Sequence, residues 1–239
     1  MNKKRLTRFI NKYYLNGTVN SVVLNSKSDK LSARFISGDK TLLGELVMDK
    51  SQIEECEVGV YNTEQLSKLL GVLDDDINIS VVKSGDKSIA LKVSDAYSSV
   101  NYMLSDVSVI NRPPQLKEIP EFQLKIDVTP NFVNKFISGK GALSDTDNFT
   151  VITDDTGTKL VIGYSSVNTN RVTIPVTTSE SANIENVSFN ANIFREVLHA
   201  NKECESATFE VSSEGLSRIT FKIDDYVSTY YLVSVQDLD

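Results

Sequence analysis

The spacing of apolar residues predicts an amphipathic helix at residues 3–15. Its apolar positions follow the i, i+3, i+4, i+7 pattern of a buried helical stripe and are Leu6, Phe9, Ile10 and Tyr13. Cations recur at every fourth position on the opposite face, at Lys4, Arg8 and Lys12. Gly17 is a suitable residue to end the helix. The segment is therefore expected to bury one face and to present a cationic one.

Three more helices are predicted from N-cap residues that precede apolar stripes. The first begins at Asn62 or Thr63, the second at Thr129 and the third after Asn190. Gly139 is expected to close the second of them. The stripes that these helices are expected to bury are Leu66, Leu69, Leu70 and Leu73; Phe132, Val133, Phe136 and Ile137; and Ile193, Phe194, Val197 and Leu198.

Most of the remaining chain alternates between apolar and polar positions or is rich in β-branched residues, as strands are. The turn sequences Lys83–Asp86 and Asp154–Gly157 lie between such runs, which is typical of hairpins. The candidate strands cover residues 19–25, 31–37, 41–48, 56–61, 77–83, 88–94, 122–128, 148–153, 158–164, 171–177, 207–212 and 217–223.

The second half of the chain repeats the first. The matched segments lie 123, 128 and 129 residues apart and are Phe9–Tyr13 with Phe132–Phe136, Val60–Leu66 with Ser188–Phe194, and Asp95–Ser105 with Asp224–Ser234. The first pair reads aromatic–aliphatic–Asn–Lys–aromatic in both copies. The third pair begins with Asp-x-Tyr and has a second tyrosine five residues later. Three matches in one order indicate an internal duplication.

A proline-rich segment separates the two repeats. Residues 111–120 contain three prolines, which favour an extended backbone without ladder hydrogen bonds. We interpret this segment as a connector between an N-terminal domain at 1–110 and a C-terminal domain at 121–239. Because each half combines two helices with many antiparallel strands, the predicted fold class is α+β.

The charge is unevenly distributed along the chain. The net charge is −7, which argues against a simple basic DNA-binding domain. Residues 1–16 nevertheless carry five cations and no acid, which leaves 20 cations against 32 acidic residues in the remainder. This asymmetry suggests one positive surface on an otherwise acidic body.

Few residues are suited to catalysis or to metal binding. Cys56 and Cys204 belong to no CxxC pair and His199 is the only histidine, so no metal site and no cofactor are expected. No Walker loop, GxGxxG or HExxH motif is present. The acidic runs 74–76 and 154–155 could be imagined as Mg²⁺ ligands of a nuclease, but their turn context favours solvated loops. We therefore expect a protein that is not an enzyme, with reduced thiols, no membrane span and no secretory signal.

Several segments resemble the DNA sliding clamps of T-even-type bacteriophages. The chain resembles them in its N-terminal helix and in Val58–Tyr61 leading into a helix at Leu66–Leu73, followed by the acidic turn at 74–76. Tyr226–Val233 resembles the last strand of these clamps, before a short acidic tail with Asp237 and Asp239. The resemblance covers nearly the whole chain. It implies a clamp fold of two similar domains, each with two helices packed on a curved antiparallel sheet.

The resemblance also implies a function and a set of partners. Family members form closed homotrimeric rings around duplex DNA, with helices lining the hole and sheets joined edge to edge. They bind DNA non-specifically, tether the replicative DNA polymerase as a processivity factor and are placed on DNA by a clamp loader. Coupling to late-transcription factors is a further implication. The expected location is the cytoplasm of an infected bacterial host.

A sliding clamp has to attract phosphates without reading bases, which spaced cations on helix faces achieve. We expect the hole to be lined by Lys4, Arg5, Arg8, Lys12, Lys68, Lys135, Lys140, Arg195, His199 and Lys202. For a single lysine the alternative is an ordinary solvated helix face. The stripe of the first helix is a better candidate, because no acidic residue accompanies it in sixteen residues.

Partner proteins of such rings insert a short hydrophobic peptide beside the connector between the domains. The residues expected to form this pocket are Leu116, Ile119, Phe122, Tyr231 and Leu238, although ordinary packing of a linker and a final strand would also explain them. Ring closure requires sheet edges that pair between subunits, for which 99–107 and 171–177 are the candidates.

A different class of protein also fits part of the pattern. A β-rich structural component of a virion, or a protein-interaction module, built from two similar domains, would account for the duplication and the net acidity. The cationic first helix fits that alternative less well. Retention on circular but not on linearised DNA would separate the two interpretations, because only a closed ring is trapped topologically.

Overall fold

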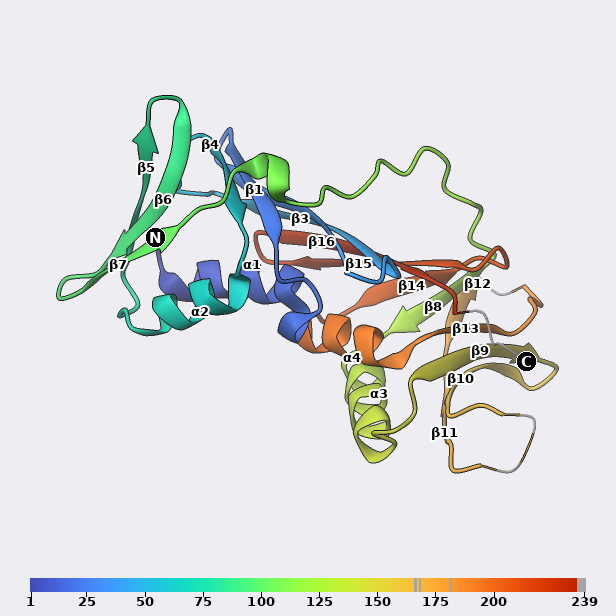
Figure 1. The fold of residues 1–239 in the computed structure, drawn as a ribbon. Helices are drawn as coiled ribbons and strands as arrows, with labels where there is room; N and C mark the ends of the chain where they lie inside the picture. The colour runs from blue at the N-terminus through green and yellow to red at the C-terminus, as the bar shows by residue number, and fades with distance from the viewer. Residues whose placement is uncertain (166, 168, 181, 236–239) are drawn as a thin grey trace. The chain divides into compact units, whose positions relative to one another are not determined.

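The chain forms two compact units of α+β architecture, with four α-helices and antiparallel strands in the part that the structure describes (Figure 1). The structure is a computed structural model and describes residues 1–165, 167, 169–180 and 182–235. Unit 1 comprises Met1–Gly38, Leu43–Pro114 and Asp224–Ser228. Unit 2 comprises Asp39–Leu42, Gln115–Ile223 and Thr229–Asp239. The predicted fold class is confirmed at the level of α+β with antiparallel sheets.

Unit 1 contains two helices and two sets of strands. The strands β3, β2, β1 and β4 are neighbours in that order, and β5, β6 and β7 form a second sheet in chain order. The elements are α1 (Lys3–Tyr14), β1 (Val22–Lys27), β2 (Lys30–Ile36), β3 (Leu42–Asp49), β4 (Cys56–Val60), α2 (Thr63–Gly71), β5 (Asn78–Ser84), β6 (Lys87–Ser94) and β7 (Ser99–Met103).

Unit 2 repeats this plan with extra strands. Its strands are neighbours in the orders β12-β8-β14-β15-β16 and β11-β10-β9-β13. The elements are β8 (Leu124–Val128), α3 (Pro130–Ala142), β9 (Asn148–Asp154), β10 (Gly157–Ile162), β11 (Val172–Pro175), β12 (Thr178–Glu180), β13 (Val187–Asn190), α4 (Ala191–Ala200), β14 (Ala207–Val211), β15 (Leu216–Ile223) and β16 (Tyr226–Val233).

The order of elements makes the internal duplication visible. In each unit a first helix is followed by a run of strands whose last member pairs back with its first, then by a second helix and a three-stranded meander. The run has four strands in unit 1, and in unit 2 it also contains β12, which pairs with β8. Unit 2 has one strand before its first helix, β8, which pairs with β14. In unit 1 this strand is reduced to a bridge between Asn2 and Asp76, beside which Met1 and Ile77 exchange backbone hydrogen bonds.

The core of unit 1 lies between its helices and strands. The predicted stripe of α1 is confirmed, because Leu6, Phe9, Ile10 and Tyr13 are all buried. On the sheet, Gly44 of β3 lies opposite Phe35 of β2. A Cβ atom at position 44 would lie only 2.2 Å from the Phe35 ring, so the glycine provides the space that this buried ring occupies.

The core of unit 2 is a cluster of phenylalanine rings from five elements. Phe136 of α3 meets Phe149 and Phe194 edge to face, with ring centroids 5.1 and 4.9 Å apart. Phe209 of β14 lies 4.8 Å from Phe194, and Phe189 of β13 lies 5.8 Å from Phe149. Contacts of this geometry add to the free energy gained by burying the rings. They fix both helices of the unit against its strands.

Helix starts follow the sequence closely, and helix ends follow it less well. Asn62, Thr129 and Asn190 each accept a hydrogen bond from the backbone N–H three residues later, which confirms all three N-caps. Gly139 does not end α3, contrary to prediction. The helix continues to Ala142, because Gly139 faces β11, where a Cβ atom would lie 2.9 Å from Val172 Cγ1.

Two strands of unit 2 are missing from the sequence-based prediction. β12 has only three residues, and β13 was interpreted as part of the entry to a helix. Both are too short for a periodic pattern to emerge, and each is defined by its pairing with a distant strand. In the described part of the chain, no helix is long and apolar enough to cross a membrane.

Candidate nucleic-acid interface

The outward face of α1 carries an exposed cation, Lys4. Its ammonium group lies 2.7 Å from Asp75. The hydrogen bond to Asp75 raises the pKa of Lys4, and the same bond lowers the pKa of Asp75. On α2, Lys68 pairs in the same way with Glu64 at 2.5 Å. Both predicted cations are exposed, but each has an acidic partner beside it.

Arg5 and Arg8 contact the turn between β15 and β16, which belongs to unit 1. Arg5 donates to the carbonyl oxygen of Asp49 at 2.9 Å and to Asp225 at 3.1 Å. Arg8 donates to Asp224 at 3.1 Å. The guanidinium groups are therefore held by acids more than 200 residues away in the sequence.

Tyr226 forms the centre of this contact and is 2 % exposed. Its hydroxyl donates to the carbonyl oxygen of Arg5 at 2.9 Å. Arg8 and Lys12 both lie over its ring, with their charged groups 4.9 and 5.7 Å from the centroid, within cation–π range. The turn at 224–226 thus covers one side of α1. We call this contact the clasp.

The predicted position of Lys12 on an exposed cationic face is wrong. Lys12 is fully buried, because the clasp covers its side of the helix. The exposed positions of α1 include Lys4 and Asn11, with Thr7 and Arg8 partly exposed. The outward stripe is therefore rotated from the predicted one, and it is polar with few cations.

Helix α3 presents a simpler surface. Lys135, the repeat partner of Lys12, is exposed and makes no ion pair among the described residues. Lys140 was also expected to line the hole, and this prediction is wrong. Its side chain is buried because it turns back to donate to the carbonyl oxygens of Leu143 and Ser144, at 3.2 and 2.8 Å. Lys140 therefore stabilises the C-terminal end of α3.

Helix α4 contributes the remaining predicted cations. Arg195 is partly exposed and pairs with Glu196 at 2.6 Å. His199 and Lys202 are exposed at the end of the helix. Neither makes an ion pair in the described part of the chain. Lys135, His199 and Lys202 are consequently the candidates that form no ion pair with an acid among the described residues.

The residues predicted to form a partner pocket separate into two groups. Leu116 and Ile119 are exposed on the connector. Tyr231 is buried and Phe122 is half-buried beside Arg218, whose guanidinium is 4.7 Å from the Phe122 ring centroid. Arg218 is held in turn by a two-bond pair with Glu210. Leu238 lies outside the described residues, as do Asp237 and Asp239.

A polar cleft of about 290 Å³ in unit 2 is not predicted from the sequence. It lies where the β14–β15 turn, the start of β13 and the end of β16 converge, and it is lined by Asn186, Val187, Ser188, Ser213, Glu214, Gly215, Ser234 and Val235. Backbone bonds from Ser234 to Gly215 and from Val235 to Ser188 hold its walls together. The small polar residues of these segments gave no pattern that marks a cleft.

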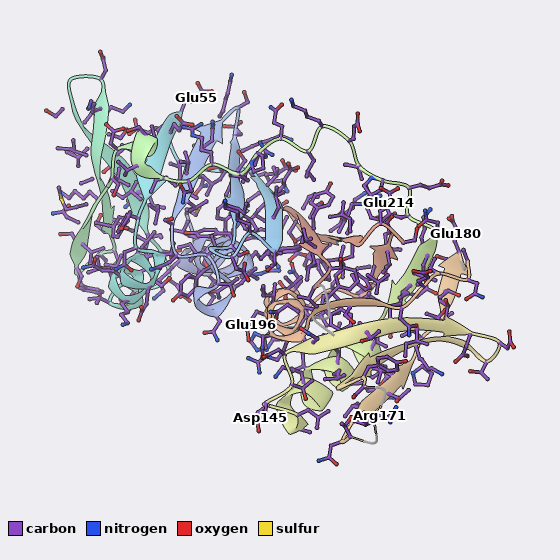
Figure 2. All side chains as sticks on the ribbon, turned by 45° about the vertical axis from the view of Figure 1, so that its right-hand side comes forward. Glu55, Asp145, Arg171, Glu180, Glu196 and Glu214 are labelled. Atoms are coloured by element: carbon purple, nitrogen blue, oxygen red, sulfur yellow. The ribbon has the colours of Figure 1, made fainter. Side chains whose placement is uncertain are left out.

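Two strands, β7 and β11, stand at the edges of their sheets. In β7 the N–H of Leu104 points to β6, so by alternation the N–H groups of residues 99, 101 and 103 point outward. In β11 the N–H of Val176 points to β10, so residues 171, 173 and 175 face outward. Arg171 is exposed at the start of this edge (Figure 2). The described residues contain no cluster of His, Cys, Asp and Glu suited to a metal ion.

Comparison with known proteins places this architecture in a known fold. No family model matches the chain, and no curated protein matches it in sequence. The structure is similar to proliferating cellular nuclear antigen from Entamoeba histolytica, with a TM-score of 0.75, 14% identity and coverage of 99% of this chain and 97% of that one. It is also similar to a chain of the PCNA2–PCNA3 complex from Sulfolobus tokodaii, with a TM-score of 0.71, 12% identity and coverage of 98% and 97%. The chain therefore has the DNA-clamp fold.

Proposed function

We propose that this protein is a sliding clamp that encircles duplex DNA and tethers a DNA polymerase for processive synthesis. The observation that carries the proposal is the fold, which matches clamp structures over nearly the whole length of both chains. The duplicated unit, with its two helices on strands, supports the same function. The sequence resemblance to T-even-type phage clamps supports a bacteriophage origin, action in the cytoplasm of an infected bacterium and a homotrimeric ring.

Non-specific attraction to phosphates is the proposed mode of DNA binding. Lys135 and Lys202 form no ion pair within the described part of the chain, and Lys4, Lys68 and Arg195 contribute charge that their acidic partners reduce. The exposed faces between them hold amides and hydroxyls, such as Asn11, which form short-lived contacts. Such a surface attracts a polyanion without fixing the protein at one sequence.

The proposed ring closes through two of the sheet edges. β7 of one copy pairs antiparallel with β11 of the next, so that the outward N–H groups of residues 99, 101 and 103 find partners. Pro175 fits the end of such an edge, because it has no N–H to leave unpaired. Three such junctions between two-unit chains complete a ring of six units.

Protein partners are proposed to bind beside the connector. Leu116 and Ile119 are exposed there, while Arg112 bonded to Glu57 at 2.9 Å and Arg34 bonded to Pro114 at 2.9 Å anchor its start. A polymerase or clamp-loader peptide with apolar side chains would cover these two residues. The same site would serve late-transcription factors. Replacing Leu116 and Ile119 by Ala should impair polymerase stimulation while leaving the ring intact.

Topological retention tests the central claim. The protein is loaded on a circular duplex with a clamp loader, and retention is measured before and after one restriction cut. A sliding clamp stays on the circle and leaves the linear form, whereas a structural or interaction protein shows no difference between the two. Sedimentation over a range of concentrations tests the trimer separately, at three times 26.5 kDa.

A pair of variants tests the strand edge. Asn101→Pro removes one outward N–H of β7 and keeps the bonds that β7 makes with β6, since residues 100, 102 and 104 make those. Asn101→Ala removes only an exposed side chain and is the matched control. The proline variant should dissociate the ring and the alanine variant should not. Equal behaviour of the two variants would place the junction elsewhere.

A further inference from the structure

The turn that forms the clasp has a counterpart in the first repeat, and the tyrosine of that counterpart is exposed. Asp224–Tyr226, which covers α1, aligns with Asp95–Tyr97 in the turn between β6 and β7. Tyr226 is 2 % exposed, whereas Tyr97 is 89 % exposed. An aromatic ring left so fully in water is uncommon, because tyrosine normally buries its apolar body.

The helix that would receive such a turn is also uncovered. Lys12, whose ammonium group lies over the ring of Tyr226, aligns with Lys135 of α3. Lys12 is fully buried by the clasp, and Lys135 is exposed without an ion pair in the described part of the chain. The neighbouring position that holds Arg8 in α1 holds Asn131 in α3, which is exposed as well. The first repeat therefore has an exposed tyrosine ring at Tyr97, and the second repeat has an exposed helix face at Lys135 of α3.

The geometry of the sheet edges brings these two features together between copies. In unit 1 the turn at 224–226 lies beside the end of β3 and the start of α1, because Asp49 N–H donates to Asp225 O and Arg5 donates to Asp49 O. In unit 2 the end of β11 likewise lies beside the start of α3, since Asp127 N–H donates to Thr177 O at 2.9 Å. Antiparallel pairing of β7 with β11 puts the turn at 95–98 at that end.

We propose that Tyr97 of one copy packs on α3 of the next copy, with Lys135 over its aromatic ring. The clasp is then repeated at each junction between copies of the proposed trimer. This inference rests on the proposed ring. The partner is a second copy of this chain, because the chain already makes the same contact internally, between the turn of its second repeat and the helix α1 of its first.

The second clasp is weaker than the first. Asp224 and Asp225 pair with Arg8, Arg5 and Lys50 in the internal clasp. Their counterparts cannot do the same at α3. Asp95 is committed to its own turn, where it accepts from the N–H groups of Asp74, Tyr97 and Ser98, and Ala96 carries no charge. The junction between copies is thus held by a ring and a lysine without the surrounding ion pairs, and it opens before the internal one does.

Sedimentation of Tyr97 and Lys135 variants tests the proposal. Tyr97→Ala should raise the midpoint concentration of ring dissociation about tenfold or more, the effect of losing one desolvated cation–π contact at each junction. Lys135→Ala should act in the same direction, and the double variant should be little worse than either single one. Tyr97→Phe, which keeps the aromatic ring, should have a midpoint concentration of dissociation close to that of the unsubstituted protein.

The outcomes separate this contact from the ring itself. Tyr97 is almost wholly exposed, so its variants keep the fold of the monomer, which thermal unfolding verifies. If Tyr97→Ala leaves the midpoint concentration of trimer dissociation unchanged while Asn101→Pro dissociates the trimer, the proposed trimer is supported and the proposed contact of Tyr97 with α3 is wrong. Fully additive effects of Tyr97→Ala and Lys135→Ala would also overturn the contact. A chain that is monomeric at every concentration would instead overturn the proposed ring.

Discussion

Helices α1 and α3 hold the same place in the two repeats, yet their cations behave in opposite ways. The first turns of α1 are rich in Lys and Arg, and most of this charge is paired or buried: Arg5 and Arg8 bind Asp225 and Asp224, and Lys12 lies under the clasp. Lys135 of α3 has no other cation within four residues and is exposed. The comparison teaches that a run of cations in the sequence measures local composition, whereas surface charge depends on which distant acids the fold brings beside it.

The largest expected difference concerns the clasp itself. Tyr226→Ala should lower the free energy of unfolding by about 3–5 kcal/mol, as for other buried aromatic residues, because it leaves a cavity beside α1. Tyr97→Ala should change the stability of the monomer by less than about 0.5 kcal/mol. Urea titration of both variants at a concentration where the chain is monomeric checks this. Similar losses of unfolding free energy in the two variants would show that Tyr97, like Tyr226, is packed within its own chain.

The two lysines of α3 provide a matched pair. Lys140→Met should cost about 1–2 kcal/mol, since it removes two hydrogen bonds that a buried ammonium makes to the last carbonyls of the helix region. Lys135→Met should be close to neutral in the monomer. Thermal unfolding of both variants at low protein concentration distinguishes them. A destabilising Lys135→Met would mean that this side chain has a structural partner within its own chain.

The N-caps of the two helices should also differ. Thr129→Ala should cost about 1 kcal/mol, because Thr129 accepts from Phe132 N–H at the start of α3. Asn2→Ala should cost less, since backbone bonds between residues 1–3 and 75–77 also fix the start of α1. Chemical denaturation measures both losses. A larger loss for Asn2→Ala would show that these backbone bonds contribute little.

Acid should weaken the contacts of Asp225 in the clasp, and this is the smallest effect. A hydrogen bond from Lys50, together with the charges of Lys50 and Arg5, lowers the pKa of Asp225 below its usual 3.8. A carboxylate with a lowered pKa in the folded state stabilises the fold above its unfolded pKa, and this contribution is lost as the pH falls through the lowered value. Stability should therefore decline below about pH 4, and Asp225→Asn should flatten this decline. An unchanged pH profile in that variant would exclude Asp225 as its source.

Local features of the fold could be read from the sequence, and long-range ones could not. The N-caps at Asn62, Thr129 and Asn190 are confirmed because a cap and the N–H that it accepts lie three residues apart. The buried stripe of α1 is confirmed for the same reason. The partners of Arg5 and Arg8 lie 220 and 216 residues away, and no pattern within a helix indicates them.

The site predictions divide along the same line. Lys12 was placed by helical periodicity alone, which locates a residue on a face but does not reveal that a turn from the far end of the chain covers that face. Lys140 was placed by its charge, although a lysine just before the end of a helix can satisfy the last carbonyls. The polar cleft arises where three segments that are distant in sequence converge, so only the folded chain defines it.

The glycine opposite Phe35 has a consequence in genetics. Every single-base change at the first or second position of a glycine codon either adds a side chain or ends translation, and a Cβ atom at position 44 meets the Phe35 ring at 2.2 Å. The ring is buried in β2 and cannot retreat without disturbing the core, which costs about 1–3 kcal/mol. Position 44 is therefore where random mutagenesis should readily yield heat-sensitive alleles, even though it lies on no predicted contact surface.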